Sequence, residues 1–102
     1  MNSIFISVII CCYNSEKYII ETLKSVINQT YNKYEIIIVD DGSQDNTSKL
    51  INKFILDNLK IKIKIISQKN SGLPTARNKA IANAKYDFIA ILDHDDLWDS
   101  NK

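Results

Sequence analysis

The sequence contains little glycine, cysteine or histidine, and each shortage excludes a class of protein. Its two glycines, Gly42 and Gly72, cannot form the Gly-x-Gly-x-x-Gly loop that a dinucleotide-binding dehydrogenase needs after its first strand. Its two cysteines, Cys11 and Cys12, are neighbours in an apolar run, where a mutual disulfide is unfavourable and free thiols are readily buried. Because His94 is the only histidine, no Cys and His set can complete a zinc site.

Long apolar runs and an excess of one charge are also missing. The N-terminal apolar run from Ile4 to Cys12 is far shorter than the roughly 20 residues that cross a bilayer, and it lacks the features of a signal peptide. Lys+Arg 13 against Asp+Glu 12 gives no overall basic character of the kind that binds nucleic acid. We therefore expect a cytoplasmic protein with no nucleic-acid partner, and the inner face of the membrane is the alternative location.

Strand-like and helix-like segments alternate along the chain. Three segments with helical spacing of apolar residues separate four β-branched, apolar runs, which are Ile4–Cys12, Glu35–Asp40, Ile61–Ser67 and Phe88–Asp93. This β-α-β-α-β-α-β order predicts one α/β domain over residues 1–102, a Rossmann-like, doubly wound parallel sheet. Right-handed crossovers with the third strand at the edge give the strand order 3-2-1-4.

Local patterns refine this expectation. The strict alternation of Ile and Lys from Ile61 to Ile65 predicts an edge strand with one face in water, whose lysines discourage aggregation. Ser15 is a candidate N-cap for the first helix, and Asp45 or Asn46 for the second. Pro74 suits the first turn of the third helix.

Acidic and polar residues follow three of the four predicted strands. In a parallel sheet, ligands bind beyond the carboxyl ends of the strands at the topological switch, here between strands one and four. The segments that meet there are Cys12–Ser15, Asp40–Ser43 and Asp93–Asp96. Carboxylates gathered at one rim repel one another unless a cation joins them, and Mg²⁺ or Mn²⁺ commonly bridges carboxylates to substrate phosphates. A turn and helix-cap cluster and a solvated acidic loop are the alternative readings of the last two segments.

Four ordered motifs lie between Ser7 and Trp98. They are Ser7-Val8-Ile9-Ile10-x-x-Tyr13-Asn14, then Ile38-Val39-Asp40-Asp41-Gly42-Ser43-x-Asp45-x-Thr47, then Asn70-x-Gly72-x-x-x-Ala76-Arg77-Asn78, and finally Leu92-Asp93-x-Asp95-Asp96. Together they resemble the motifs of family 2 glycosyltransferases. The resemblance implies a partial GT-A fold, the nucleotide-sugar-binding half of an enzyme whose second half binds the acceptor. One departure is Cys11-Cys12, where the family commonly has Pro-Thr, so a thiol replaces a hydroxyl near the base.

The resemblance also implies roles for particular residues. Tyr13 would line the uracil pocket, Asp40 would bond the base, and Arg77 would lie near the uracil or the diphosphate. Asp93 would face the ribose or the metal, and Asp95 would ligate Mn²⁺ or Mg²⁺. The other members of the implied nucleotide-sugar site are Cys12, Asn14, Asp41 and His94.

The expected chemistry is glycosyl transfer from a UDP-sugar. The metal and Arg77 would neutralise the charge that develops on the UDP leaving group. In this family a carboxylate well downstream of the Asp-x-Asp loop deprotonates the acceptor hydroxyl in an inverting reaction, so no catalytic base is expected before Lys102. We therefore expect a truncated donor-binding half, whose partners in the whole enzyme are a UDP-sugar and a glycan, polysaccharide or lipid-linked acceptor. Peripheral membrane association through the absent regions and self-association stay open.

Three other functions remain to be weighed. A nucleotide-binding pseudoenzyme would bind the donor without turnover, and sequence does not separate it from a truncated transferase. A Mg²⁺-binding phospho-receiver module would need its acidic pair after strand one, where this chain has Tyr13-Asn14. A sugar nucleotidyltransferase would carry a Gly-rich first loop with a basic residue, and Cys12-Tyr13-Asn14 is not such a loop.

Overall fold

The chain forms a two-sided α/β domain with alternating strands and helices. The computed structural model describes residues 4–29 and 31–93. In chain order the elements are β1 (Ile6–Cys12), α1 (Ile19–Ile27), β2 (Tyr34–Asp40), α2 (Thr47–Asp57), β3 (Ile63–Ser67), α3 (Leu73–Ala82) and β4 (Phe88–Asp93). Within these residues no helix is long and apolar enough to cross a membrane.

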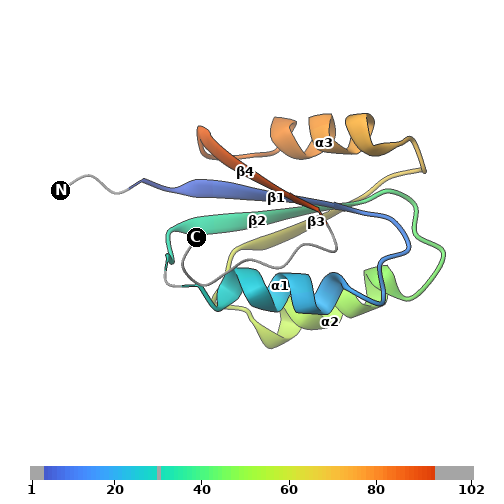
Figure 1. Cartoon of the computed structure of the whole chain (residues 1–102), viewed down its shortest axis with the longest axis horizontal. Helices are drawn as coiled ribbons and strands as arrows, with labels where there is room; N and C mark the ends of the chain where they lie inside the picture. The colour runs from blue at the N-terminus through green and yellow to red at the C-terminus, as the bar shows by residue number, and fades with distance from the viewer. Residues whose placement is uncertain (1–3, 30, 94–102) are drawn as a thin grey trace.

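All four strands are parallel, in the order β3-β2-β1-β4 (Figure 1). Both the α/β class and the strand order are as predicted. In the centre of the sheet, Ile10 of β1 lies opposite Ile38 of β2 and Leu92 of β4. The predicted switch point, where the crossover direction reverses, therefore lies between β1 and β4.

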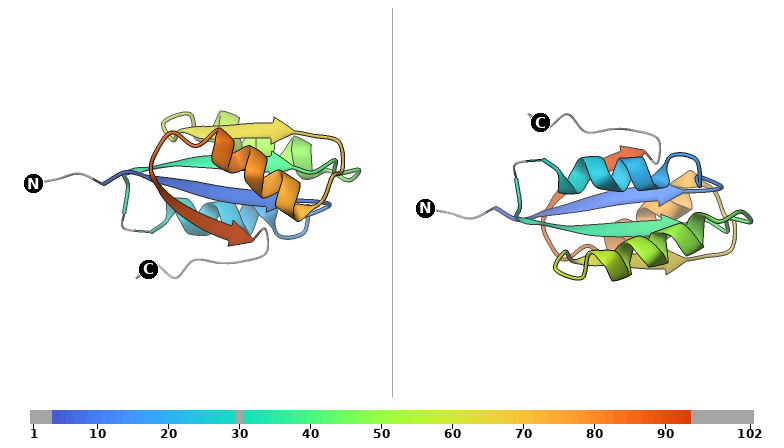
Figure 2. Two further views of the ribbon diagram at one scale, coloured as in Figure 1. Left: turned by 90° about the horizontal axis from the view of Figure 1, so that it is seen from above. Right: turned by 90° about the horizontal axis from the view of Figure 1, so that it is seen from below.

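Helices cover the two faces of the sheet unequally. α1 and α2 lie side by side on one face, while α3 lies alone on the other (Figures 1 and 2). The two-helix side holds the larger apolar cluster, built around Ile10, Ile38 and Leu23 of α1. On the other side, the small residues Ala76 and Ala80 let α3 approach β1 and β2 closely. β1 and β2 are buried from both sides, as their nearly continuous apolar sequences require.

β3 is the edge strand that the Ile and Lys alternation predicted. Ile63 and Ile65 are partly buried against the α1 and α2 cluster, while Lys62 and Lys64 are exposed. The strand is shorter than expected, since it begins at Ile63 and not at Ile61. Ile61 still belongs to the bend after α2, since its N–H donates to the Asn58 carbonyl, while Lys62 leads into the strand.

A polar network closes the sheet at the amino ends of its strands. The Ser7 hydroxyl donates to Glu35 Oε2 at 2.6 Å, and the same oxygen accepts the backbone N–H of Lys85 at 2.7 Å. The backbone N–H of Tyr86 donates to Ser7 Oγ at 3.1 Å, and the Tyr86 ring stacks on Phe5. These contacts fix the crossover from α3 into β4 and hence the position of β4 beside β1.

Candidate functional site

The loops that follow β1, β2 and β4 meet at one end of the sheet. Cys12 of β1 lies opposite Asp40 of β2, and Cys11 lies opposite Asp93 of β4. Asp40 and Asp93 therefore end β2 and β4 on the same rim, as predicted, with only β1 between these two strands. In both views of Figure 2 the strand arrows point toward this end, where the loops before α1, α2 and α3 also lie.

Asp41 ties the β2 end to the loop before α3. Its Oδ1 accepts hydrogen bonds from the Gln68 amide and the Ser71 backbone N–H, both at 2.8 Å, and its Oδ2 accepts the Gly72 N–H at 3.0 Å. Its backbone carbonyl accepts the Asn70 side chain at 3.0 Å. Burial raises the pKa of Asp41, but these hydrogen bonds to the charged form outweigh burial and hold the pKa below its ordinary value. Asp41 is thus a buried, ionised anchor.

Gly42 is required by the close approach of the same loop. Its φ is +79°, and a Cβ atom at this position would lie 2.8 Å from the backbone nitrogen of Asn70. A side chain would therefore push the β3–α3 loop away from the β2 end. Gly42 and Asp41 therefore both allow the β3–α3 loop to lie against the end of β2.

Asp40 and Cys12 form a buried pair beside this anchor. The Ser43 N–H donates to Asp40 Oδ1 at 3.1 Å, and the Ser43 hydroxyl donates to the same oxygen. The side chains of Asp40 and Cys12 are almost fully buried. Burial first, and then the negative charge of Asp40, raise the pKa of the Cys12 thiol far above its usual range. Cys12 therefore enters the site as a neutral thiol, and neither cysteine forms a disulfide.

The loop after β1 is bound directly to the loop after β2. The backbone N–H of Asn14 donates to Ser43 Oγ at 2.8 Å, and Asn14 Oδ1 accepts the backbone N–H of Gln44 at 2.8 Å. The Ser15 N–H donates to Thr47 Oγ1 at 2.7 Å, in a fully buried contact. Asn14, which is expected to bind the nucleotide sugar, thus also holds the two loops together through these hydrogen bonds. Its backbone φ is +49°.

Asp45 and Glu16 complete this junction. Asp45 accepts the Thr47 N–H at 2.9 Å, the Thr47 hydroxyl, and the Glu16 N–H at 3.3 Å. Glu16 in turn accepts the Asn46 N–H at 3.2 Å. Burial raises the pKa of Asp45, but the hydrogen bonds that it accepts from Thr47 and Glu16 lower the pKa by more, so the net pKa lies below the ordinary value. The Asp-x-Thr part of the second motif is therefore a structural clamp.

Tyr13 and Arg77 lie around this rigid frame. Tyr13 is the first residue after β1 and its side chain is 44% exposed, so its ring is available at the rim. Arg77 lies in the second turn of α3 and is partly buried. Because α3 starts at the rim that Asp41 anchors, the position of Arg77 depends on the β2 to α3 contact.

The expected metal ligands are only partly within the described residues. The backbone places Asp93 at the end of β4, whereas His94 and Asp95 lie outside the described residues. Among the side chains that the structure describes, no three of Asp, Glu, His or Cys lie close enough together to hold a metal ion. The metal site therefore stays a prediction, based on the carboxylates that the sequence places after β4.

Comparison with known proteins connects this rim to a family. The sequence model described as "Glycosyl transferase family 2" matches residues 7–102. The chain belongs to glycosyl transferase family 2. It is 39% identical over 98 residues to the glycosyltransferase GlyG of Streptococcus pneumoniae serotype 4, covering 94% of this chain and 32% of GlyG. The family 2 chain thus spans about a third of that relative.

Solved structures show the same architecture in GT-A enzymes. Staphylococcus aureus TarS (residues 1–349), in complex with UDP-GlcNAc, superimposes with a TM-score of 0.86 at 35% identity, over 96% of this chain and 28% of TarS. The mannosyltransferase PcManGT of Pyrobaculum calidifontis, in complex with GDP-Man and Mn²⁺, gives a TM-score of 0.88 at 27% identity, over 91% of this chain and 28% of that chain. The predicted family and fold are both confirmed.

Proposed function

We propose that this family 2 chain is the donor-binding part of a metal-dependent glycosyltransferase and that its donor is a UDP-sugar. The observation that carries the proposal is the rim itself, where Tyr13 and Asp40 lie at the same end of the sheet as the end of β4 in a family 2 fold. TarS was solved with UDP-GlcNAc, and PcManGT with GDP-Man and Mn²⁺. These complexes support a nucleotide-sugar donor and a divalent metal, and they leave the base and the choice of Mn²⁺ or Mg²⁺ to experiment.

Each proposed contact has a physical reason. The exposed Tyr13 ring can stack on uracil, while Asp40 can accept a hydrogen bond from the base through the oxygen that Ser43 does not occupy. Arg77 would neutralise negative charge on the base side or on the diphosphate. Cys12, Asn14, Asp41 and His94 complete the proposed donor site, although Asn14 and Asp41 act at least partly by holding its loops.

The carboxylates after β4 suit a hard divalent cation. Asp93 and Asp95 would hold Mn²⁺ or Mg²⁺, since both ions prefer oxygen ligands. When bound, the metal supplies Lewis-acid stabilisation of the diphosphate leaving group. The chain's own contribution is to orient the donor and to keep Arg77 and the buried thiol of Cys12 in place around it.

Transfer itself needs an acceptor and a base. We propose an inverting reaction in which a carboxylate deprotonates a hydroxyl of a glycan or lipid-linked acceptor. The proposed location is the cytoplasm or the inner face of the membrane. A pseudoenzyme that binds the donor without turnover is the second candidate, because the frame around Tyr13 would serve binding equally well.

Titration calorimetry tests the donor proposal. We expect UDP to bind in the presence of Mn²⁺ or Mg²⁺ and to lose most of its affinity in EDTA or in the Asp95→Asn variant, because the ion held by Asp95 would supply the positive charge that attracts the diphosphate. The matched control is Asp87→Asn, which removes an exposed carboxylate at the opposite end of β4 and should leave affinity unchanged. Equal UDP affinity with and without EDTA would show that binding needs no metal. Tighter binding of GDP than of UDP would show that the donor is not a UDP-sugar. A product assay with UDP-sugars and glycan or lipid-linked acceptors separates an enzyme from a pseudoenzyme.

A further inference from the structure

Although the total charge is nearly balanced, one segment of the chain has charged residues of positive sign only. Residues 58–86 contain no Asp or Glu, and their seven cationic residues are Lys60, Lys62, Lys64, Lys69, Arg77, Lys79 and Lys85. This segment forms β3, α3 and the adjoining loops, so the cations lie along one edge and one face of the sheet (Figure 1). Several acidic residues of the described chain lie at the donor rim, while Glu35 and Asp57 border this segment.

The cations are closest together in sequence at the start of β3. Lys60, Lys62 and Lys64 are all exposed, and none forms an ion pair with a described residue. Lys64 reaches only the neutral amide of Asn83, at 3.5 Å. These three ammonium groups are therefore available to an anionic partner.

Two exposed leucines precede these lysines. Leu56 is 69% exposed and Leu59 is 75% exposed, the highest values among the large apolar side chains that the structure describes. Together with Lys60, the two leucines line a surface recess of about 510 Å³. Lys62 and Lys64 line a second recess, of about 210 Å³, along β3. Apolar and cationic side chains thus share one corner of the molecule, where α2 turns into β3.

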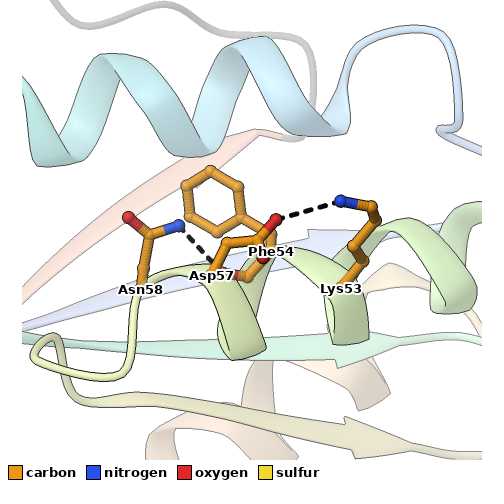
Figure 3. A network of polar contacts seen from close by, with 4 residues as sticks. All are labelled: Lys53, Phe54, Asp57 and Asn58. Carbon is orange, nitrogen blue, oxygen red and sulfur yellow. Dashed lines mark hydrogen bonds and ion pairs between the residues drawn. The ribbon is translucent and has the colours of Figure 1, made fainter.

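The end of α2 holds this corner in place. The Asn58 side chain donates to the backbone carbonyl of Phe54 at 2.8 Å, while Phe54 is buried in the core (Figure 3). Asp57 is the nearest carboxylate in the sequence, and its ion pair with Lys53 at 3.1 Å offsets its charge (Figure 3). Leu56 and Leu59 are therefore presented by a capped helix end without an unpaired acidic neighbour.

We propose that the leucine–lysine corner, defined as Leu56, Leu59, Lys60, Lys62 and Lys64, docks on an anionic lipid surface. Lysines are attracted to anionic headgroups, while leucines at the same depth can insert beneath them. A soluble polyanion would use the lysines but would give the leucines no apolar partner, so the combination favours lipid. The proposal does not depend on glycosyl transfer.

The position of the corner fits such docking. α2 runs from the donor rim to the amino end of the sheet, so the corner lies at the opposite end from Tyr13 and Asp40 (Figure 1). A protein docked through this corner keeps its donor rim facing the solution, where a soluble nucleotide sugar can enter.

Vesicle co-sedimentation of the 102-residue chain tests the proposal. We expect binding to phosphatidylglycerol vesicles and little binding to neutral phosphatidylcholine vesicles, with the binding weakened by added salt. Because each lysine near an anionic surface strengthens binding about fivefold, the triple variant K60Q/K62Q/K64Q should bind at least about tenfold more weakly. The double variant L56S/L59S should also weaken binding, and its exposed positions should leave the fold intact by circular dichroism.

The matched control is K17Q/K24Q/K49Q, which removes the same charge from exposed positions away from the corner and should bind within about twofold of the original chain. Equal loss in both triple variants would show that total charge acts, not the corner. If L56S/L59S binds the vesicles as well as the original chain does, and polyphosphate binds the chain as strongly as the vesicles do, the partner of the corner is a soluble polyanion and not a lipid surface. Absence of binding to phosphatidylglycerol would overturn the proposal outright.

Discussion

At the scale of single residues, Asp41 shows how a carboxylate at a binding rim can serve the fold. Its two oxygens accept three hydrogen bonds from Gln68, Ser71 and Gly72, so the loop before α3 is fastened to the end of β2. A neutral amide cannot replace it, because one of its two terminal groups would turn an N–H toward a backbone N–H. The charge and both oxygens of Asp41 are therefore needed together.

We expect Asp41→Asn to lower the free energy of unfolding by about 2–3 kcal/mol, since hydrogen bonds to a buried charged group are lost and a donor is left unpaired. Urea unfolding followed by circular dichroism measures this. The control Asp87→Asn changes an exposed carboxylate and should stay within about 0.5 kcal/mol of the original chain. Similar values for both variants would mean that the Asp41 contacts contribute nothing to stability.

Asp41 also makes stability depend on pH. Its pKa in the folded chain lies below its ordinary value of 3.8, which it regains on unfolding. Its contribution is therefore complete above pH 3.8 and is lost as the pH falls below that value through the folded pKa. We expect the difference in unfolding free energy between Asp41→Asn and the original chain to shrink in this acid range, as measured by urea unfolding over a pH series.

Sequence reasoning located these residues but not their bonds. Asp40 and Asp41 follow a predicted strand, so their place at the carboxyl rim could be predicted from the parallel topology. The partners of Asp41 are 27 to 31 residues away along the chain, and only the folded β3–α3 loop brings them near. The pair Asn70 and Gly72 in the third motif was the available signal, although it did not specify Asp41 as the partner.

At the scale of elements, the loops after β1 and β2 form one unit. Ser15 was expected to cap α1, and that prediction is wrong: α1 begins at Ile19, and its N-cap residue Tyr18 makes no side-chain cap. The physical reason is that the Ser15 hydroxyl bonds Tyr13, while its backbone N–H bonds Thr47. α2 agrees better with expectation, because it starts after Asn46 and Asp45 accepts its first N–H.

Thr47 is the centre of this junction, and it allows a matched test. Thr47→Val keeps the size of the side chain but leaves the buried Ser15 N–H without its acceptor, so we expect a loss of about 1–3 kcal/mol in the free energy of unfolding. Thr47→Ser keeps the hydroxyl and loses only a methyl group, at a cost of about 1 kcal/mol. Urea unfolding compares them, and a larger loss for the serine variant would show that packing, not the hydrogen bond, makes Thr47 important.

The elements themselves were predictable because burial imposes periodicity. β1 and β2, buried on both faces, read as continuous apolar runs, and β4 has its predicted bounds. The start of β3 was placed two residues early, because Ile61 continues the alternating pattern although the chain is still turning there. Such ends depend on local turn contacts, here Ile61 N–H to the Asn58 carbonyl at 3.0 Å, that alternation does not encode.

At the scale of the whole molecule, the two edges of the described sheet differ. β3 contains the exposed Lys64 and follows the exposed Lys62, and such charges oppose pairing with another strand. On β4, Phe88, Ile89 and Ile91 are 59%, 38% and 49% exposed, and no charged residue lies between Phe88 and Leu92. Register with Ser7 and Ile9 places the two isoleucines on the α3 face, yet α3 packs on β1 and β2. Within residues 4–29 and 31–93, that strip of β4 has no cover.

This uncovered strip predicts that the 102-residue chain associates with itself. An exposed apolar strand at a sheet edge lowers its free energy by packing against another apolar surface, and a second copy supplies one in a purified sample. We expect sedimentation velocity to show oligomers that grow with concentration. The double variant I89T/I91T should shift the distribution toward monomer, because threonine keeps the β-branched shape while removing apolar surface. The control Ile81→Thr changes a similarly exposed isoleucine on α3, at 41%, and should leave the distribution unchanged. A monomer at all concentrations would contradict the prediction, and equal effects of both variants would place the contact elsewhere than on β4.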